Sequence, residues 1–337
     1  MGSVKDLEID EEPTPEKPGH GVFHFSDRYS VFDWGRMPKN IDKKGEALAL
    51  MGAHTFEVLQ QGGIDTHYKG MGEKGEIKNL DELENPSEKM HVKLVNVIEP
   101  EFKEGKYDYT ELHNSSVNNY LIPLEIIYRN RIPKGSSARR RYNPKELNLG
   151  MEEWPDEPVS LKEPILEAST KLEEQDRYID DEEAKRISGI SLDKIYDITG
   201  EINQIITERA EKVGLRHDDG KVEFLYSDGE ILLGDVAGTF DEARFTFDGV
   251  QVSKEVLRQA YKKEQPEWVE EVKEAKEKAK EEGLRDWKKL VDREPGPLGI
   301  EDLVSEMYQA GANEYIGIDF FDVRDFSDVV EDLKNTL

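Results

Sequence analysis

The 337-residue chain contains no cysteine. Disulfide bonds, thiol nucleophiles and cysteine-based zinc or iron–sulfur centres are therefore excluded. Its seven histidines form no HExxH or HxH motif, so the sequence does not predict a zinc site. The chain also lacks a run of about 18–20 apolar residues, which a membrane helix needs, and the apolar segment of a secretory signal. These absences predict a soluble, cytoplasmic protein.

Positive charge is in deficit, because 46 Lys and Arg stand against 74 Asp and Glu, a net charge of -28. A surface of this sign repels nucleic acid and anionic membranes, so neither is expected as a partner. Two interpretations stay open: a halophilic protein adapted to a salty cytoplasm, or an ordinary acidic protein with charged helices. Hydrophobic residues at 36% suffice for a packed core, and the length favours two domains.

Apolar periodicity and helix stop signals predict a mixture of helices and strands. Helices are expected at residues 44–63, 180–214, 253–261, 265–283 and 299–317, and strands at 21–35, 90–100 and 119–133. Loops are expected at 8–20 and 143–164, and an insertion at 101–119. The apolar strand at 119–133 is a natural hinge between two domains.

The segment from Arg216 to Phe245 predicts a β-hairpin that carries acids where core residues are usual. Asp219, Lys221 and Glu223 alternate along the first strand and so share one face. A two-residue turn at Asp228-Gly229 would place the acid at 235 on the opposite, apolar face.

A three-residue turn that includes Ser227 would instead pair Lys221 with Asp235 and leave Phe224 opposite Leu232. We expect this second register, because it buries one consistent apolar face. It gathers two carboxylates from adjacent strands, Glu223 and Asp235, which is a ligand set for a hard cation such as Mg²⁺. The alternative is a solvated sheet face held by cross-strand ion pairs.

A cluster of cations stands out in this anionic chain, in the sequence RNRIPKGSSARRRY at residues 129–142. Arginine side chains match phosphate and carboxylate oxygens, and Gly135 with its neighbouring serines lets backbone approach an anion closely. The segment predicts a site for a phosphorylated small molecule, and the alternative is ion pairing with the acidic surface. The polar stretches at 169–177 and 239–244 are expected to line the same cleft.

Four motifs in order carry a resemblance to a known family. They are SDRYSVFDWGRMPKNIDKKGEAL, IPLEIIYRNRIPKGSS, DGKVEF and LGDVAGTFDEARF. Together they resemble the phosphoribosylaminoimidazole-succinocarboxamide synthases (SAICAR synthetases) of purine biosynthesis, in an acidic, archaeal form. The similarity covers roughly residues 1–60 and 119–261, with a weaker echo at 299–317.

The resemblance implies an α+β, two-domain SAICAR synthetase-like fold. A small β-rich domain, residues 1–122, would cover the nucleotide, and a larger α+β domain with an antiparallel sheet, residues 123–337, would carry the hairpin and the ribotide site. The implied reaction joins L-aspartate to the carboxylate of a carboxyaminoimidazole ribotide with ATP and Mg²⁺. A homodimer is implied in the same way.

The resemblance also implies roles for individual residues. Three would act in catalysis, namely Asp219, Lys221 and Arg129. Four would bind ATP, namely Lys5, Glu125, Lys221 and Lys171. Four would bind the ribotide, namely Arg129, Ser136, Arg244 and Asp241. Mg²⁺ would be held by Glu223 and Asp235.

Three departures from the family pattern bear on these roles. Ser3 stands where a lysine is usual, Val236 replaces an acid, and the RIPKGSS segment has an extra residue before Gly135. Two other functions therefore stay open: another ATP-dependent phosphotransferase or carboxylate–amine ligase with a different acceptor, and a nucleotide-binding relative without turnover.

Overall fold

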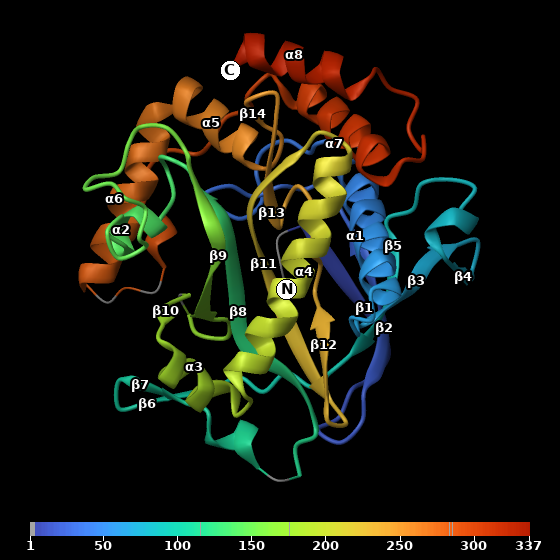
Figure 1. Cartoon of the computed structure of the whole chain (residues 1–337), viewed down its shortest axis with the longest axis vertical. Coiled ribbons are helices and arrows are strands. Elements are labelled where there is room, and N and C mark those ends of the chain that lie inside the picture. Colours follow the sequence, from blue (N-terminus) through green and yellow to red (C-terminus); the bar gives the residue numbers. More distant parts are fainter. Residues whose placement is uncertain (1–3, 115, 175, 283, 285) are drawn as a thin grey trace.

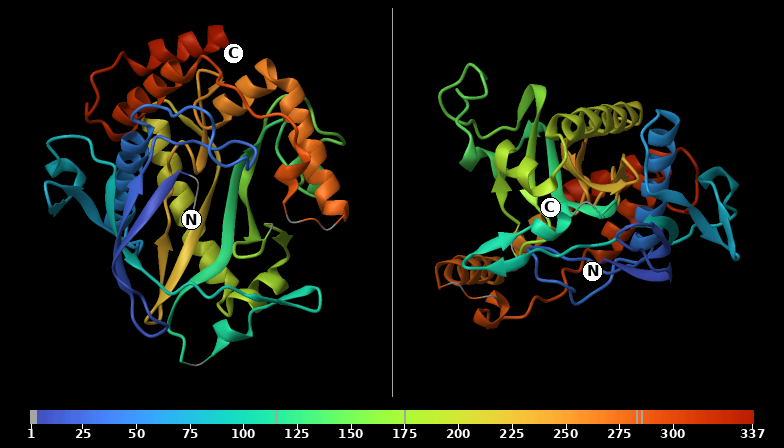
Figure 2. Two further views of the ribbon diagram at one scale, coloured as in Figure 1. Left: turned by 180° about the vertical axis from the view of Figure 1, so that it is seen from behind. Right: turned by 90° about the horizontal axis from the view of Figure 1, so that it is seen from below.

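The computed structural model describes residues 4–114, 116–174, 176–282, 284 and 286–337. Two antiparallel sheets stand side by side in it, with helices packed around them (Figures 1 and 2). The first sheet has five strands in the order β1-β2-β5-β3-β4. Its strands are β1 (Lys5–Glu11), β2 (Gly19–Phe25), β3 (Tyr68–Glu73), β4 (Glu76–Lys78) and β5 (Lys89–Leu94).

The second sheet has seven strands in the order β10-β9-β8-β11-β13-β14, with β12 paired to β11. Its longest members lie at the centre, where β8 and β11 pair along almost their whole lengths. The strands are β8 (Asn119–Ile132), β9 (Val159–Thr170), β10 (Tyr178–Ile179), β11 (Arg216–Ser227), β12 (Glu230–Gly234), β13 (Ala243–Phe247) and β14 (Val250–Gln251). A separate hairpin, β6 (Glu101–Lys103) with β7 (Lys106–Asp108), lies in the expected insertion.

The two sheets are joined through the backbone of residues 65–67. The Leu233 N–H donates to the Asp65 carbonyl at 2.8 Å, and the His67 N–H donates to the Leu233 carbonyl at 2.9 Å. One continuous cluster of buried apolar residues runs from Phe25 in the first sheet to Leu333 near the C-terminus. The described residues therefore share one main core beneath both sheets, beside a small separate cluster of Val95, Leu225 and Leu232.

Helices cover both sheets. They are α1 (Lys44–Gln61), α2 (Ala138–Arg141), α3 (Asp181–Ser188), α4 (Leu192–Lys212), α5 (Glu255–Glu264), α6 (Pro266–Glu282), α7 (Glu301–Ile316) and α8 (Phe326–Thr336), with single 3₁₀ turns at Leu80–Glu82, Thr110–His113 and Trp287–Leu290. Helix α1 packs against the first sheet and also against α7, and α4 packs against β8 and β11 (Figure 1). No helix in these described ranges is long and apolar enough to cross a membrane.

Helix α4 shows why the sequence folds this way locally. Its buried isoleucines, Ile195, Ile202 and Ile206, recur at the spacing of one helix face. They pack against the face of the second sheet that carries Ile126 and Tyr128, both completely buried. The opposite face of β8 and β11 is thereby left for polar side chains.

The helices expected from periodicity are confirmed at all five places, and the strands at three. Two loop predictions are partly wrong. Strand β1 occupies the first part of the expected loop at 8–20, and β9 begins at Val159 inside the expected loop at 143–164. Strand β1 escaped prediction because it is an edge strand with mostly exposed residues, and only Leu7 and Ile9 provide its alternation of apolar and polar residues. Helix α8 was not predicted.

Candidate active site

The polar face of strands β8 and β11 places four charged side chains in two opposed pairs. The register sets Glu223 opposite Glu125 and Asp219 opposite Arg129. Between them Lys221 donates to Glu125 at 2.8 Å. The neighbouring Val222 and Phe224 are each 1% exposed in the core. The predicted sharing of one face by Asp219, Lys221 and Glu223 is confirmed.

The predicted hairpin turn is wrong. Ser227 pairs with Glu230, so the turn has two residues, Asp228 and Gly229. Their φ angles of 52° and 91° are the left-handed values that a two-residue type I′ turn requires at both positions. Consequently Phe224 pairs with Leu233 rather than with Leu232.

Asp235 nevertheless avoids the apolar face, and not for the predicted reason. Strand β12 ends at Gly234, and Asp235 adopts a left-handed backbone with φ 52°. Its side chain forms an ion pair with Lys5 of β1, and its carbonyl accepts a hydrogen bond from His67 Nε2 at 2.9 Å. Lys221 is not opposite Asp235. The backbone twist, rather than strand pairing, brings Asp235 to the cavity that Glu223 also lines.

The charges around Glu223 and Asp235 are unequally balanced. Burial, followed by the nearby Asp235 carboxylate, raises the pKa of Glu223 to about 7, although Lys171 and Lys221 oppose the shift. Burial also acts to raise the pKa of Asp235, but Lys5 outweighs it and lowers that pKa to about 2. Burial and the Asp235 carboxylate together therefore outweigh the lysines beside Glu223. Two neighbouring carboxylates, one of them buried, suit a hard divalent cation.

Glu125 organises the lysines of the site. It accepts from Lys221 at 2.8 Å and from Lys171 at 2.9 Å, and Lys171 also donates to Glu223 at 2.7 Å. Burial alone would raise the pKa of Glu125, but the two lysines hold it below its usual value. Lys221 also lies 3.6 Å from Glu242. Two ammonium groups are thus fixed beside the Glu223 carboxylate.

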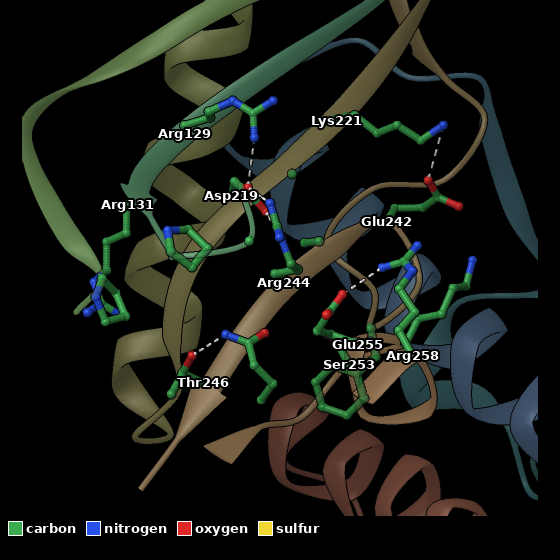
Figure 3. Close-up of a pocket in the computed structure, with 18 of the residues that line it drawn as sticks. Arg129, Arg131, Asp219, Lys221, Glu242, Arg244, Thr246, Ser253, Glu255 and Arg258 are labelled. Carbon is green, nitrogen blue, oxygen red and sulfur yellow. Dashed lines mark hydrogen bonds and ion pairs between the residues drawn. The ribbon is translucent and has the colours of Figure 1, made fainter. Parts of the chain in front are cut away.

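Asp219 lies between two arginines from the strands on either side of β11. It accepts from Arg129 of β8 at 3.1 Å and from Arg244 Nε of β13 at 2.7 Å (Figure 3). Arg129 also donates to Glu167 at 2.5 Å and to the Tyr178 hydroxyl at 3.0 Å. Arg129 and Asp219 are both at most 5% exposed. These contacts hold both guanidinium groups at fixed positions at the edge of a cavity.

This cavity, of about 710 Å³, is cationic although the chain is strongly acidic. Its lining includes four carboxylates, those of Asp219, Asp241, Glu242 and Glu255. Nine cationic side chains line it, namely Arg129, Arg131, Lys134, Arg216, Lys221, Arg244, Lys254, Arg258 and Lys262. Five of them, Arg129, Arg131, Lys221, Arg244 and Arg258, are labelled in Figure 3. An excess of guanidinium and ammonium groups in a concave site is suited to a phosphorylated ligand.

The contribution of helix α5 to this cavity was missed in the sequence. Lys254, Arg258 and Lys262 recur every fourth residue and so lie on one helix face. Arg258 is held by Glu255 at 3.1 Å. A cationic stripe at helical spacing in a chain of charge -28 was the available signal, but residues 253–261 were predicted only to be helical, and Lys262 lay outside that range.

Asp241 lies at the far wall of the cavity in a buried network. It accepts from Lys44 of α1 at 2.8 Å and from the Tyr308 hydroxyl of α7 at 2.7 Å, and Lys254 lies at 3.3 Å. Burial would raise the pKa of Asp241, but Lys254 and Lys44 hold it well below its usual range. Burial lowers the pKa of Lys44, which is completely enclosed. The network ties α1 to the loop before β13.

The cation-rich segment at 129–142 both forms ion pairs and lines the cationic cavity. Arg131 pairs with Asp218 at 2.9 Å while also lining the cavity. Arg139 instead donates to backbone carbonyls, including that of Ile132 at 3.1 Å. Ser136 is buried, and its hydroxyl accepts from the Ala138 N–H at 3.3 Å, whereas Gly135 and Ser137 line the cavity.

A second cavity, of about 390 Å³, lies between the two sheets. Apolar side chains from both sheets line it, among them Leu7, Phe23, Val95, Leu121 and Leu225. Glu223 and Asp235 lie at its edge, with His67 and Lys93. The cavity has the size and lining of a pocket for a flat, apolar ring with a charged tail.

Comparison with known proteins identifies the family of this chain. A model of the SAICAR synthetase family matches residues 13–275. The chain belongs to the SAICAR synthetase family. A relative from Archaeoglobus fulgidus, provisionally named as a phosphoribosylaminoimidazole-succinocarboxamide synthase, is 43% identical over the full length of both chains.

Solved SAICAR synthetases share the fold. A type-2 crystal form of a SAICAR synthetase in complex with ADP aligns with a TM-score of 0.56 and 24% identity, covering 77% of this chain and 88% of that one. The SAICAR synthase of Saccharomyces cerevisiae complexed with SAICAR aligns with a TM-score of 0.59 and 21% identity, covering 94% and 93%. The predicted family and α+β fold class are confirmed.

Lys5 is the one predicted nucleotide-binding residue from the first sheet, and it lies in β1 beside Asp235. Its Nζ is 4.8 Å from the centre of the Phe23 ring, which lines the apolar cavity. Ser3, the departure from the family pattern, lies outside the described residues. Val236, the other departure, is buried at 5% exposure and contributes to the core.

Proposed function

We propose that this member of the SAICAR synthetase family is an ATP-dependent ligase of purine biosynthesis. It joins L-aspartate to the carboxylate of carboxyaminoimidazole ribotide and releases SAICAR, ADP and phosphate. The observation that carries the proposal is the meeting of two unlike cavities along β11. Glu223 lines the apolar cavity and Lys221 lines the cationic one, so a nucleotide and a phosphorylated acceptor can meet over neighbouring side chains on one face of the same strand.

The apolar cavity is proposed to take the adenine ring. From there the triphosphate would run past Lys5, Lys171 and Lys221 toward the cationic cavity, with Glu125 fixing the two latter lysines. Glu223 and Asp235 are proposed to hold Mg²⁺, which neutralises phosphate charge when bound. The raised pKa of Glu223 supports this assignment, because burial and the nearby Asp235 carboxylate raise it and a divalent cation between the two carboxylates would relieve both effects.

The ribotide is proposed to occupy the cationic cavity. Arg129 and Arg244 would meet its phosphate or its carboxylate, and Asp219 keeps both guanidinium groups aimed there. Asp241 faces the same cavity and is proposed to bind the ribotide or the aspartate amine. Ser136 is proposed to act through the loop that presents Gly135 and Ser137.

The chemistry follows from the poor electrophilicity of a carboxylate. A carboxylate oxygen of the ribotide attacks the γ-phosphorus of ATP, the bond to the bridging oxygen breaks, and ADP leaves. The aspartate amine then attacks the carbonyl carbon of the acyl phosphate, the C–N bond forms, phosphate departs with the C–O bonding pair, and the amine proton passes to solvent. The protein contributes positioning and neutralisation of charge by its lysines and arginines.

Substrate omission tests the function. ADP release should require ATP, the ribotide and L-aspartate together, and SAICAR should appear in equal amount. ADP release that needs aspartate but not the ribotide would point to a different acceptor. Background release with all three substrates would show a nucleotide-binding protein without turnover.

The proposal includes four further properties of the protein: its division into two parts, its location, its oligomeric state and its adaptation to salt. We propose a division into residues 1–122 and 123–337, because the five-stranded sheet ends before it and the seven-stranded sheet lies almost wholly after it. We also propose a cytoplasmic location, a homodimer and adaptation to high salt, the last supported by the net charge of -28. Light scattering measures the dimer, and unfolding temperature against KCl concentration measures the salt adaptation.

A further inference from the structure

The outer face of the first sheet carries an unexpected group of histidines. His20 of β2 and His91 of β5 lie on adjacent strands, and Asp10 of β1 completes the group from the other side. Successive side chains of a strand point to opposite faces, so these three lie away from the face on which Met90 and Val92 enter the core. Nothing in the proposed reaction uses them.

The ligand atoms of this group are close together. His20 Nδ1 lies 3.0 Å from Asp10 Oδ2, and His20 Nε2 lies 3.4 Å from His91 Nδ1. One ligand atom from each residue lies within 4.8 Å of the other two. Two nitrogens of a tetrahedral zinc site, with bonds of 2.0–2.1 Å, are separated by about 3.3 Å. The two histidines already have this separation.

Hydrogen bonding alone leaves the group poorly satisfied. If His20 donates its Nδ1 proton to Asp10, its Nε2 carries a lone pair that is directed at His91 Nδ1. The remaining contact of 3.4 Å between the two rings is longer than a normal hydrogen bond. A cation between the rings would use both lone pairs, and a carboxylate hydrogen-bonded to a metal-binding histidine is a common arrangement.

The surroundings hold His91 in place and leave an entry path. An added β-carbon at Gly72 of β3 would lie 3.0 Å from His91 Nε2, so the ring rests directly on a glycine. Asp10 is exposed and His20 half-buried, and a groove of about 490 Å³ lined by His91, His24 and Glu8 opens beside them.

We propose that Asp10, His20 and His91 form a binding site for a borderline divalent cation of the zinc type, with water completing the coordination. The two imidazole nitrogens would be the protein ligands, with Asp10 orienting the His20 ring through Nδ1, and imidazole favours Zn²⁺, Co²⁺ or Ni²⁺ over Mg²⁺. The site joins β1, β2 and β5, and β1 carries Lys5 at the nucleotide cavity. The bound ion fixes this edge strand to its sheet.

Equilibrium dialysis of the untagged, full-length protein with Zn²⁺ alone tests the site. The wild type should retain one Zn²⁺ per chain. His91→Gln and His20→Asn should each bind at least about 100-fold more weakly, and Gly72→Ala should bind more weakly because its methyl group displaces the His91 ring. His24→Asn, on the same strand face but outside the group, and Glu223→Gln, in the active site, should bind as the wild type does.

A second measurement does not depend on activity. Co²⁺ should give the intense visible absorption of a low-coordinate nitrogen site in the wild type and lose it in His91→Gln, and Zn²⁺ should raise the unfolding temperature of the wild type only. Equal Zn²⁺ binding by the wild type, His20→Asn and His91→Gln would overturn the proposal. So would loss of binding in His24→Asn or Glu223→Gln, because the ion would then lie elsewhere.

Discussion

Glu223 and Asp219 lie four residues apart on the same face of β11, yet their surroundings differ. Asp219 has a guanidinium group on each side, from Arg129 and Arg244. Glu223 shares Lys171 with Glu125 and has the Asp235 carboxylate nearby. Two arginines neutralise the Asp219 carboxylate. At Glu223, burial and the Asp235 carboxylate outweigh the nearby lysines. We infer that Asp219 positions arginines, whereas Glu223 awaits a cation.

The largest expected effect is on turnover. Glu223→Gln keeps the shape of the side chain and removes the charge, so the proposed Mg²⁺ ligand is lost. ADP release should fall by about 10³-fold, measured at saturating substrates and with Mg²⁺ varied. Turnover within a few-fold of the wild type would contradict the metal role of Glu223.

The matching change at Asp219 should act on stability. Asp219→Asn leaves the partly buried Arg244 without its carboxylate partner and leaves Arg129 with Glu167 alone. Breaking a buried ion pair from one side costs about 3–5 kcal/mol. Urea unfolding at pH 7 should show a loss of this order. If Asp219→Asn and Glu223→Gln change the free energy of unfolding in the same direction, the contrast between the two sites is mistaken.

The next largest effect is the pH dependence of folding stability that results from Glu223. Its pKa is raised from its ordinary value of 4.5 to about 7 in the folded chain. A group with a raised pKa contributes stability that is complete below about pH 4.5 and is lost as the pH rises toward 7. The loss is about 3 kcal/mol at most. The lowered pKa of Asp235, about 2, affects folding stability only in more acidic solution, where the stability that it contributes is lost as the pH falls below about 4.

The difference in unfolding free energy between the wild type and Glu223→Gln isolates this contribution between pH 4.5 and 7.5, because groups far from Glu223 titrate equally in both and the pKa of Asp235, about 2, lies below this interval. In the absence of nucleotide and Mg²⁺, the free energy of unfolding of Glu223→Gln should rise relative to that of the wild type as the pH increases from 4.5 to 7.5. A difference that stays constant over this interval would show that Glu223 is ionised throughout.

The smallest expected effect concerns the missed helix face. Arg258→Ala removes one of the nine cations of the larger cavity and should raise the KM for the ribotide about tenfold, equivalent to about 1.4 kcal/mol, with the KM for ATP unchanged. Lys263→Ala on the same helix is the matched control, since Lys263 points to the C-terminal carbonyl groups instead. Equal changes in the KM for the ribotide in both variants would show that α5 does not contribute to the site.

The sequence predicted the helices and the shared face of Asp219, Lys221 and Glu223, because both follow from simple periodicity. It did not predict how Asp235 reaches the site. That depends on a non-glycine residue in the left-handed region, φ 52°, which no pattern of apolar residues reveals. The preference for a consistent apolar face selected the wrong turn, because the strand was assumed to continue through Asp235.

The groups that remained hidden were assembled by tertiary contacts. Lys44 and Asp241 are 197 residues apart in the chain and His20 and His91 are 71 apart. No local motif connects such partners, although each residue is visible in the sequence. The family resemblance brought Asp241 and Arg244 into consideration, but it did not include the cations of α5.

The main apolar core beneath both sheets has a practical consequence for work on this protein. Dividing the gene near codon 122 would separate α1 from α7, against which it packs. Both fragments would then expose large apolar surfaces to water. Each fragment expressed separately should aggregate, and co-expression of the two should restore solubility.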